Sequence, residues 1–175
     1  GTFYENYYYP NYIEENNIDM HHIPQNGIGL NELYTSPLVV TIHDLIPYIL
    51  PETVGRGYLQ RFLRDMPLIV NNSKIILTVS EYSKKDIMKF FPFVNEEKIF
   101  VTPLAANKSY KPLNKSNCIE YIKNKYSIDS PFILYIGGFS TRKNVKELII
   151  AFNKIKKSLK KDYKLVLCGS IKDEG

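Results

Sequence analysis

The stretch FILYIGGFSTRKN, residues 132–144, decides the fold class of this chain. It joins a continuous run of apolar and aromatic residues to two adjacent glycines, and then to the adjacent cations Arg142 and Lys143. Apolar residues recur at helical spacing from Val145 onward, so the stretch predicts a buried strand, a glycine turn and a helix. A buried strand that leads into a helix is the repeating unit of an α/β fold with a parallel sheet.

The same alternation of strands and helices extends through the rest of the chain. Apolar runs predict strands over residues 18–23, 38–43, 74–79, 98–103, 132–136 and 164–168, and the continuous runs predict burial on both faces of the sheet. Helical spacing predicts helices over residues 57–70, 81–90 and 144–159. We expect Pro67 to kink or break the first helix, Ser80 to cap the second, and the apolar stripe of the third to lie in a core.

A change in composition predicts two domains. Residues 103–117 are polar, contain prolines and show no sustained period, as expected of an interdomain linker. We therefore predict a first domain over residues 1–104, a linker over 105–117 and a second domain over 118–175. The tyrosine-rich start, residues 4–12, is predicted to be a sheet edge or a poorly ordered segment.

Composition excludes several classes of protein. With 44% hydrophobic and 23% charged residues, the chain is expected to be soluble, globular and cytoplasmic, and it has no apolar run long enough to cross a membrane. Its two cysteines and the pair His21 and His22 lack metal-ligand spacing, so no metal site is predicted. The net charge of +5 is spread over lysine-rich helix faces, which does not favour a nucleic-acid binder.

Polar residues follow three of the predicted strands, where parallel sheets collect ligands. Arg142 and Lys143 precede a helix and follow a glycine turn, which suits a diphosphate, although a plain turn with surface cations is the alternative. His43 ends an apolar strand and could be a buried neutral histidine, Asp44 could cap the next turn, and we favour a helix cap for Ser80.

Four motifs, in this order and spacing, resemble the group 1 (family 4) retaining glycosyltransferases: VVTIHDLIP at 39–47, ILTVSEYSK at 76–84, Lys98-Ile99 before a proline, and YIGG at 135–138 followed by RKN at 142–144. The resemblance implies the GT-B architecture of two Rossmann-like α/β domains with parallel sheets. The first domain would bind the acceptor, and the second would bind a nucleotide sugar.

Site residues follow from the same resemblance. It implies that Arg142 and Lys143 neutralise the donor diphosphate in place of a metal, that Gly138 allows close approach of the backbone, and that His43 is catalytic and orients the sugar. A loop at residues 22–29 resembles that of mannosyl- or rhamnosyl-type members. The residues expected on the acceptor side are Asn26, Gly27, Asp44 and Ser80.

The implied activity is transfer of a hexosyl group, mannosyl-type, from a nucleotide sugar to a saccharide or glycolipid acceptor, with retention and without a cofactor. Polysaccharide synthesis in the cytoplasm, or at the inner face of the membrane with at most peripheral contact, is the expected setting. The family's early glycine-rich loop and its Glu-x7-Glu element do not occur. We therefore expect both domains to be incomplete, this piece alone to be inactive, and exposed edges to favour a homo-oligomer. The alternative is a non-catalytic nucleotide-sugar-binding or assembly fragment.

Overall fold

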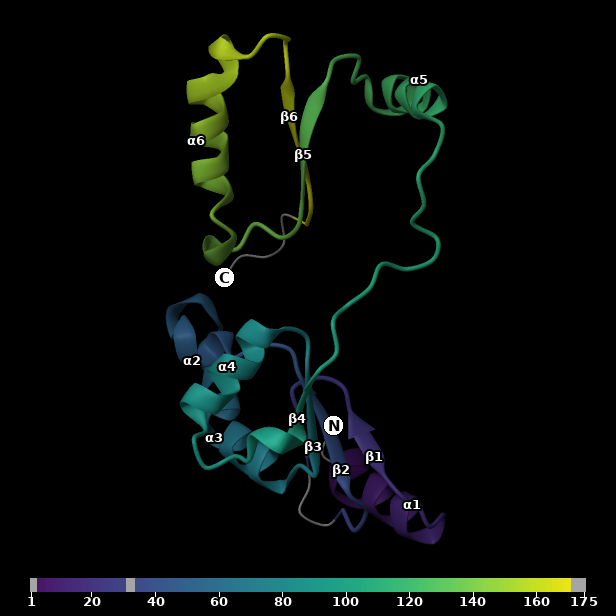
Figure 1. Cartoon of the computed structure of the whole chain (residues 1–175), viewed down its shortest axis with the longest axis vertical. Coiled ribbons are helices and arrows are strands. Elements are labelled where there is room, and N and C mark those ends of the chain that lie inside the picture. Colours follow the sequence, from purple (N-terminus) through teal and green to yellow (C-terminus); the bar gives the residue numbers. More distant parts are fainter. Residues whose placement is uncertain (1–2, 31–33, 171–175) are drawn as a thin grey trace. The chain divides into compact units, whose positions relative to one another are not determined.

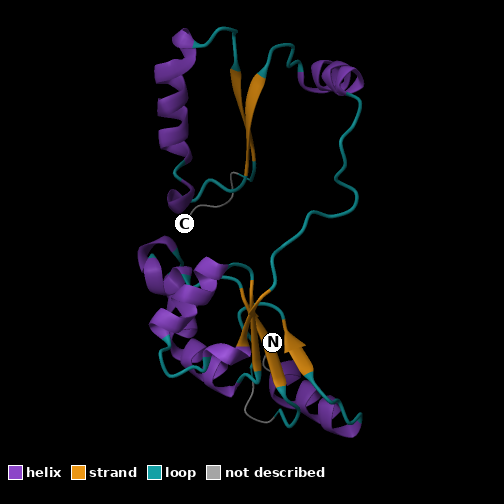
Figure 2. Cartoon of the chain, viewed as in Figure 1, coloured by secondary structure: helices purple, strands orange, loops and turns teal. Residues whose placement is uncertain are grey.

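The structure, a computed structural model, describes residues 3–30 and 34–170 and forms two compact units, Gly1–Ala105 and Ala106–Gly175. Figure 1 labels the helices and strands of both units, and Figure 2 colours them by type. Each unit combines helices with a parallel sheet, so the predicted Rossmann-like α/β class is confirmed. The assignment of acceptor and donor roles to separate domains stays a prediction.

The first unit is built on a four-stranded parallel sheet in the order β1-β2-β3-β4. The strands are β1 (His21–Ile23), β2 (Leu38–Ile42), β3 (Ile75–Thr78) and β4 (Ile99–Val101). The α-helices are α1 (Tyr9–Glu15), α2 (Ile46–Ile49), α3 (Arg56–Asn72) and α4 (Glu81–Phe90), and single turns of other helix types lie at Tyr4–Tyr8, Pro51–Thr53 and Glu96–Lys98. All four strands are shorter than predicted, and β1 begins three residues later, at His21.

The core of this unit lies between the sheet and the helices α3 and α4. Figure 1 shows α2, α3 and α4 gathered on one side of the sheet, with α1 beside β1. The buried cluster draws on the middle strands, on α3, on α4 and on the segment after α4; it includes Val40, Ile42, Phe62, Met66, Ile69, Val70, Ile76, Ile87 and Phe91. Burial of such aliphatic and aromatic side chains is the main force that holds the sheet and helices together.

One prediction for the first unit was wrong, and one of the two alternatives of another did not occur. Of the kink or break expected at Pro67, the break is absent, because α3 continues through the proline to Asn72. The buried Met66, Ile69 and Val70 surround the proline, and their burial outweighs the roughly 3 kcal/mol that an internal proline costs a helix. The tyrosine-rich start is neither an edge nor irregular, since residues 4–15 are helical, and the buried Ile13 holds the helix to the unit.

The second unit has a two-stranded parallel sheet of β5 (Phe132–Ile136) and β6 (Lys164–Cys168), as predicted in both bounds. Its helices are α5 (Lys115–Tyr126) and α6 (Val145–Ile155), with short 3-10 turns at Thr141–Lys143 and Lys156–Ser158. Helix α5 was not predicted and begins inside the expected linker, because Asn114 accepts a hydrogen bond from the Asn117 amide and caps it.

Burial in the second unit differs from the prediction. Strand β5 was expected to be buried on both faces, yet Ile136 is 73% exposed and Leu134 is 49% exposed. In the stripe of α6, Val145 is buried but Ile149 and Ile155 are each 47% exposed. A sheet of two strands with one helix following β5 offers too little surface to cover both faces of an apolar strand.

Candidate functional site

His43 is the centre of a hydrogen-bonded group at the carboxyl end of the first unit's sheet. It directly follows β2 and is half-buried. Its backbone N–H donates to Oδ1 of Asn26 at 2.8 Å, and its ring Nε2 lies 2.9 Å from the carbonyl oxygen of Pro24. Because a carbonyl only accepts, Nε2 carries the hydrogen in this contact. This contact holds the ring in one orientation.

Ser80 caps α4, as predicted. Its Oγ accepts a hydrogen bond from the Ser83 amide at 3.1 Å. The Ser83 hydroxyl in turn donates to the carbonyl oxygen of His43 at 3.0 Å. The cap of α4 thus also fixes the backbone of His43, at its carbonyl oxygen, and Ser83 is a positioning residue that the motifs alone did not single out. Its place in the first turn after a capping serine is the signal that could have identified it.

Asp44 acts on the next turn. Its Oδ1 accepts a hydrogen bond from the Ile46 amide at 3.1 Å, which is the capping role that the sequence left open. At least one carboxylate oxygen of Asp44 is therefore engaged in a local hydrogen bond at the start of α2.

The loop after β1 brings Asn26 and Gly27 to the same group. The Asn26 amide donates to the carbonyl of Thr41 at 2.9 Å, and the residue has a φ of 53°. Gly27 has a φ of 69°, and a Cβ placed there would collide with the side chain of Ile69. Only glycine satisfies both constraints without strain, so Gly27 shapes the loop. The structure thus assembles Asn26, His43, Asp44 and Ser80 around one strand end.

The second cluster lies after β5 and contains the predicted diphosphate residues. The Gly137 amide donates to the carbonyl of Cys168 at 2.9 Å, and the Tyr135 hydroxyl donates to the carbonyl of Gly138 at 2.6 Å. A Cβ on Gly169 would collide with the carbonyl oxygen of Gly137. Two adjacent parallel strands therefore leave the sheet through glycines that nearly touch. Gly169 was not predicted as part of the site, although it follows β6 as Gly137 follows β5.

Arg142 and Lys143 lie in the 3-10 turn just before α6. Both side chains are exposed, and neither forms a salt bridge with any residue within the described ranges 3–30 and 34–170. Asn144, which precedes α6 with a φ of 52°, makes no side-chain cap. Among the described residues, the first amides of α6 therefore have no side-chain cap and lie beside two cations without a salt bridge, an arrangement that favours an anion.

The two adjacent histidines of β1 face different partners. The ring Nδ1 of His21 lies 2.8 Å from Oγ of Ser36, whereas Nε2 of His22 lies 2.8 Å from Oγ1 of Thr41. Burial lowers the pKa of His21, and its contact with Ser36 partly opposes that shift. Within the described part of the chain, no three His, Cys, Asp or Glu side chains are grouped to hold a metal ion.

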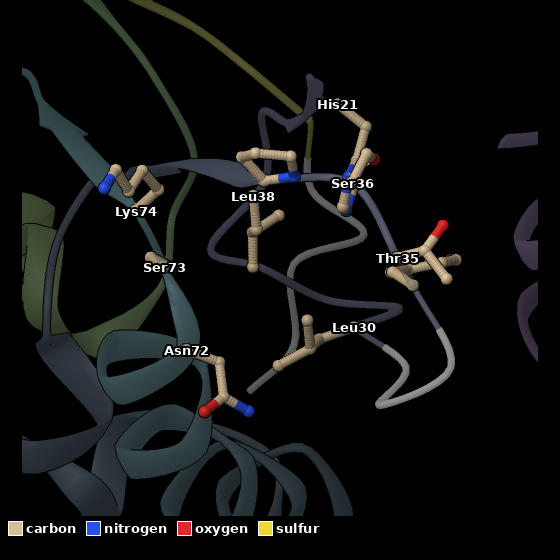
Figure 3. Close-up of a pocket in the computed structure, with 10 residues that line it drawn as sticks. His21, Leu30, Thr35, Ser36, Leu38, Asn72, Ser73 and Lys74 are labelled. Atoms are coloured by element: carbon tan, nitrogen blue, oxygen red, sulfur yellow. The ribbon is translucent and has the colours of Figure 1, made fainter. Parts of the chain in front are cut away.

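A cavity of about 680 Å³ lies at the opposite end of the same sheet. Figure 3 shows it between His21 and Ser36 on one side and Asn72, Ser73 and Lys74 on the other. Leu38 begins β2 and Lys74 precedes β3, so these residues mark the amino ends of the strands. Ligands of parallel sheets collect at the carboxyl ends, where His43 lies. This cavity is therefore separate from the candidate site.

Comparisons with known proteins support the resemblance. Residues 119–175 match the family model described as "Glycosyl transferases group 1". The chain is 27% identical over 131 residues to "O-antigen chain mannosyltransferase B" of Escherichia coli, a match that covers 75% of this chain and 34% of that protein. It is 23% identical over 138 residues to "Serotype-specific mannosyltransferase WbdA" of Escherichia coli, covering 78% of this chain and 17% of that protein.

The family match falls on the second unit, which holds Gly138, Arg142 and Lys143. The predicted resemblance to the group 1 glycosyltransferases is confirmed. The chain spans about a third, or less, of the length of these relatives. No helix in the described ranges is both long and apolar enough to cross a membrane.

Proposed function

We propose that this chain forms part of a glycosyltransferase that moves a mannosyl-type hexosyl group from a nucleotide sugar to a saccharide or glycolipid acceptor with retention. The observation that carries the proposal is the pair Arg142 and Lys143, which is exposed just before α6, forms no salt bridge with any residue that the structure describes, and lies inside the region that matches the family. The names of the two relatives favour mannose as the sugar and polysaccharide synthesis as the process. Such synthesis would take place in the cytoplasm or at the inner face of the membrane.

The reaction breaks the bond between the sugar's anomeric carbon and the diphosphate oxygen, and it forms a bond from the same carbon to an acceptor hydroxyl. The nucleoside diphosphate leaves with the bonding electrons, and the proton of the acceptor hydroxyl passes to the departing diphosphate. Arg142 and Lys143 would stabilise the negative charge that develops on the leaving group. Two protein cations can fill the role that a metal ion has in other transferases, so we propose that transfer needs no metal.

Residues of the first unit would act on the sugar and the acceptor. His43 has its ring fixed through Nε2 and its backbone fixed by Asn26 and Ser83, so it is suited to orient a bound sugar. Gly27 holds the loop that carries Asn26, and Asp44 and Ser80 stabilise the neighbouring turns. We assign catalysis to His43, place Asn26, Gly27, Asp44 and Ser80 on the acceptor side, and treat Ser83 as a further positioning residue.

Calorimetry with UDP, GDP, ADP and GDP-mannose, with and without Mg²⁺, tests the donor site. We expect one nucleotide to bind equally well without metal and the variant Arg142→Ala/Lys143→Ala to bind it at least about 100-fold more weakly, because hydrogen bonds to charged groups are worth about 1.5–3 kcal/mol each. The matched control is Lys156→Ala/Lys157→Ala, which removes two adjacent cations at the other end of α6.

Equal affinity in the Arg142/Lys143 variant and the control would refute the diphosphate assignment. Binding that requires Mg²⁺ would refute the proposed metal independence. Nucleotide-sugar binding without any transfer, in protein of the relatives' full length, would favour the alternative of a non-catalytic binding fragment.

A further inference from the structure

A groove of about 520 Å³ lies in the first unit between α1 and the edge strand β1. Three tyrosines from two segments line it, Tyr9 and Tyr12 of α1 and Tyr34 of the segment before β2. The remaining lining comes from Ile13 of α1, from Ile18, from β1 and from the loop that follows it. Grooves with aromatic walls and a few polar groups are the usual form of small-ligand sites.

The tyrosine rings beside this groove remain open to solvent. Tyr9 and Tyr12 are each 48% exposed, although Ile13, which follows Tyr12 in the same helix, is 8% exposed. The rings of Tyr8 and Tyr12 are stacked, with centroids 6.1 Å apart and planes 21° from parallel. Helix α1 therefore uses its aliphatic face for packing and presents a row of rings outward, which a core helix would bury.

The charge of the segment that forms the groove indicates which class of ligand it can bind. All 23 lysines and arginines of the chain lie at or after Arg56, so the first 55 residues contain none, whereas they contain acidic residues such as Glu14, Glu15 and Asp19. A phosphate, a nucleic acid or an anionic lipid surface needs cations that this segment lacks. A neutral, hydroxyl-rich ligand fits, because the C–H face of a sugar packs on an aromatic ring and its hydroxyls reach phenol and imidazole groups.

The groove is continuous with the loop that holds His43. Pro24 lines the groove, and its carbonyl oxygen accepts the hydrogen bond from His43 Nε2. Gly29 also lines it, and its carbonyl accepts a hydrogen bond from the Tyr34 hydroxyl at 3.2 Å. A chain of sugar units that lies along α1 can thus extend toward the strand end where the candidate catalytic group is assembled.

We propose that the groove between α1 and β1 is a subsite for neutral, mannose-type units of the acceptor saccharide, remote from the hydroxyl that reacts. The identity of the ligand as acceptor rests on the proposed function. The binding itself is a property of the tyrosine-lined groove and can be measured without any transfer.

Saturation-transfer NMR with α-linked mannotriose and mannohexaose tests the subsite on the 175-residue chain. We expect saturation to reach the ring C–H protons of the mannose units, and Tyr9→Ala/Tyr12→Ala to weaken binding about tenfold. Tyr9→Phe/Tyr12→Phe keeps the rings and should lose no more than about threefold, which separates stacking from a fold defect. Tyr82→Ala is the matched control, because Tyr82 is 75% exposed on α4 away from the groove.

Unchanged affinity in the alanine variant, or no saturation from either oligosaccharide, would overturn the subsite. Binding of phosphatidylglycerol vesicles that the alanine variant abolishes would overturn it too, in favour of a membrane contact. Nucleotide titration of the same samples separates the two proposals. Nucleotide binding without oligosaccharide binding refutes only the subsite, and oligosaccharide binding without nucleotide binding refutes only the donor site.

Discussion

The two units share one sequence pattern, an apolar strand followed by a loop and a helix, but they differ in what the strands bury. Four of the five residues of strand β2 are buried, with Val40 and Ile42 at 0% exposure. Strand β5 has an equally apolar sequence, yet four of its five residues are exposed. The difference lies in the surroundings, since β2 has a strand on each side and β5 has one neighbour. An apolar strand sequence indicates that burial would be favourable, but the strand is buried only where neighbouring strands and helices pack against it.

The candidate site residues of the two units also differ in how many interactions they form with the rest of their unit. His43 and Ser80 are tied into hydrogen bonds within the first unit. Arg142 and Lys143 form no salt bridge inside the described ranges. The first unit therefore holds His43 and Ser80 in fixed positions on a packed core. The second unit instead presents two exposed cations, which form no salt bridge with a described residue, in a turn beside a two-stranded sheet.

Truncation of a strand side chain should give the largest difference in stability loss between the two units. Replacing Ile76, which is fully buried in β3, by alanine should lower the free energy of unfolding by about 2–5 kcal/mol, because it leaves a cavity. Ile136→Ala in β5 should change it by about 0.5 kcal/mol or less, because that side chain is already exposed. Urea unfolding followed by circular dichroism measures both. Similar losses in the two variants would mean that β5 is covered in solution.

Glycine substitution tests the close approach of the strand ends in the second unit. Gly169→Ala should cost about 1–3 kcal/mol and weaken nucleotide binding, because its Cβ would meet the Gly137 carbonyl. Gly57→Ala in α3 is the control, since nothing lies within 4 Å of its added Cβ, and it should be neutral or stabilising by up to about 1 kcal/mol. Thermal unfolding and the nucleotide titration measure the two effects, and a harmless Gly169→Ala would contradict the described contact.

Helix caps offer a smaller comparison between the units. Ser80→Ala and Asn114→Ala each remove an N-cap, and each should cost about 1 kcal/mol. We expect the larger loss at Ser80, because its partner Ser83 also holds the backbone of His43. Amide exchange in the first turn of each helix, together with the unfolding midpoint, checks the order. A larger effect at Asn114 would show that the hydrogen bonds around His43 add nothing to the cap.

His21 should make the first unit slightly sensitive to acid. Burial lowers its pKa from the ordinary 6.5 in the fold. The unfolded chain therefore binds more protons below about pH 6.5, and stability should fall as the pH drops through that value toward the lowered pKa. His21→Gln should reduce this slope, while His22→Gln, at an exposed neighbour, should leave it in place. Unfolding midpoints between pH 8 and pH 5 measure the slope, and equal slopes in wild type and His21→Gln would exclude this role.

Much of the fold could be read from local pattern. The bounds of β5 and β6 agree with prediction, and Ser80 caps α4 as expected from a serine between a strand and a helical run. Helix α5 and the helical start were missed because their lysines, asparagines and tyrosines give no clear apolar face. A helix over residues 57–70 was predicted with a kink or a break at Pro67, and α3 has no break there because burial of the neighbouring side chains outweighs the local cost of the proline.

The sequence by itself determined the fold class, the order of the strands with helices α3, α4 and α6, and the residue types available at each strand end, because apolar periodicity and turn residues act over short stretches of chain. Only the tertiary structure decided that Asn26 and Ser83 hold the backbone of His43, that Gly169 meets Gly137, and that the rings of α1 border a groove. These contacts join residues far apart in the chain. They depend on the parallel register of the strands and on the left-handed backbone of the loop after β1, which no local pattern specifies.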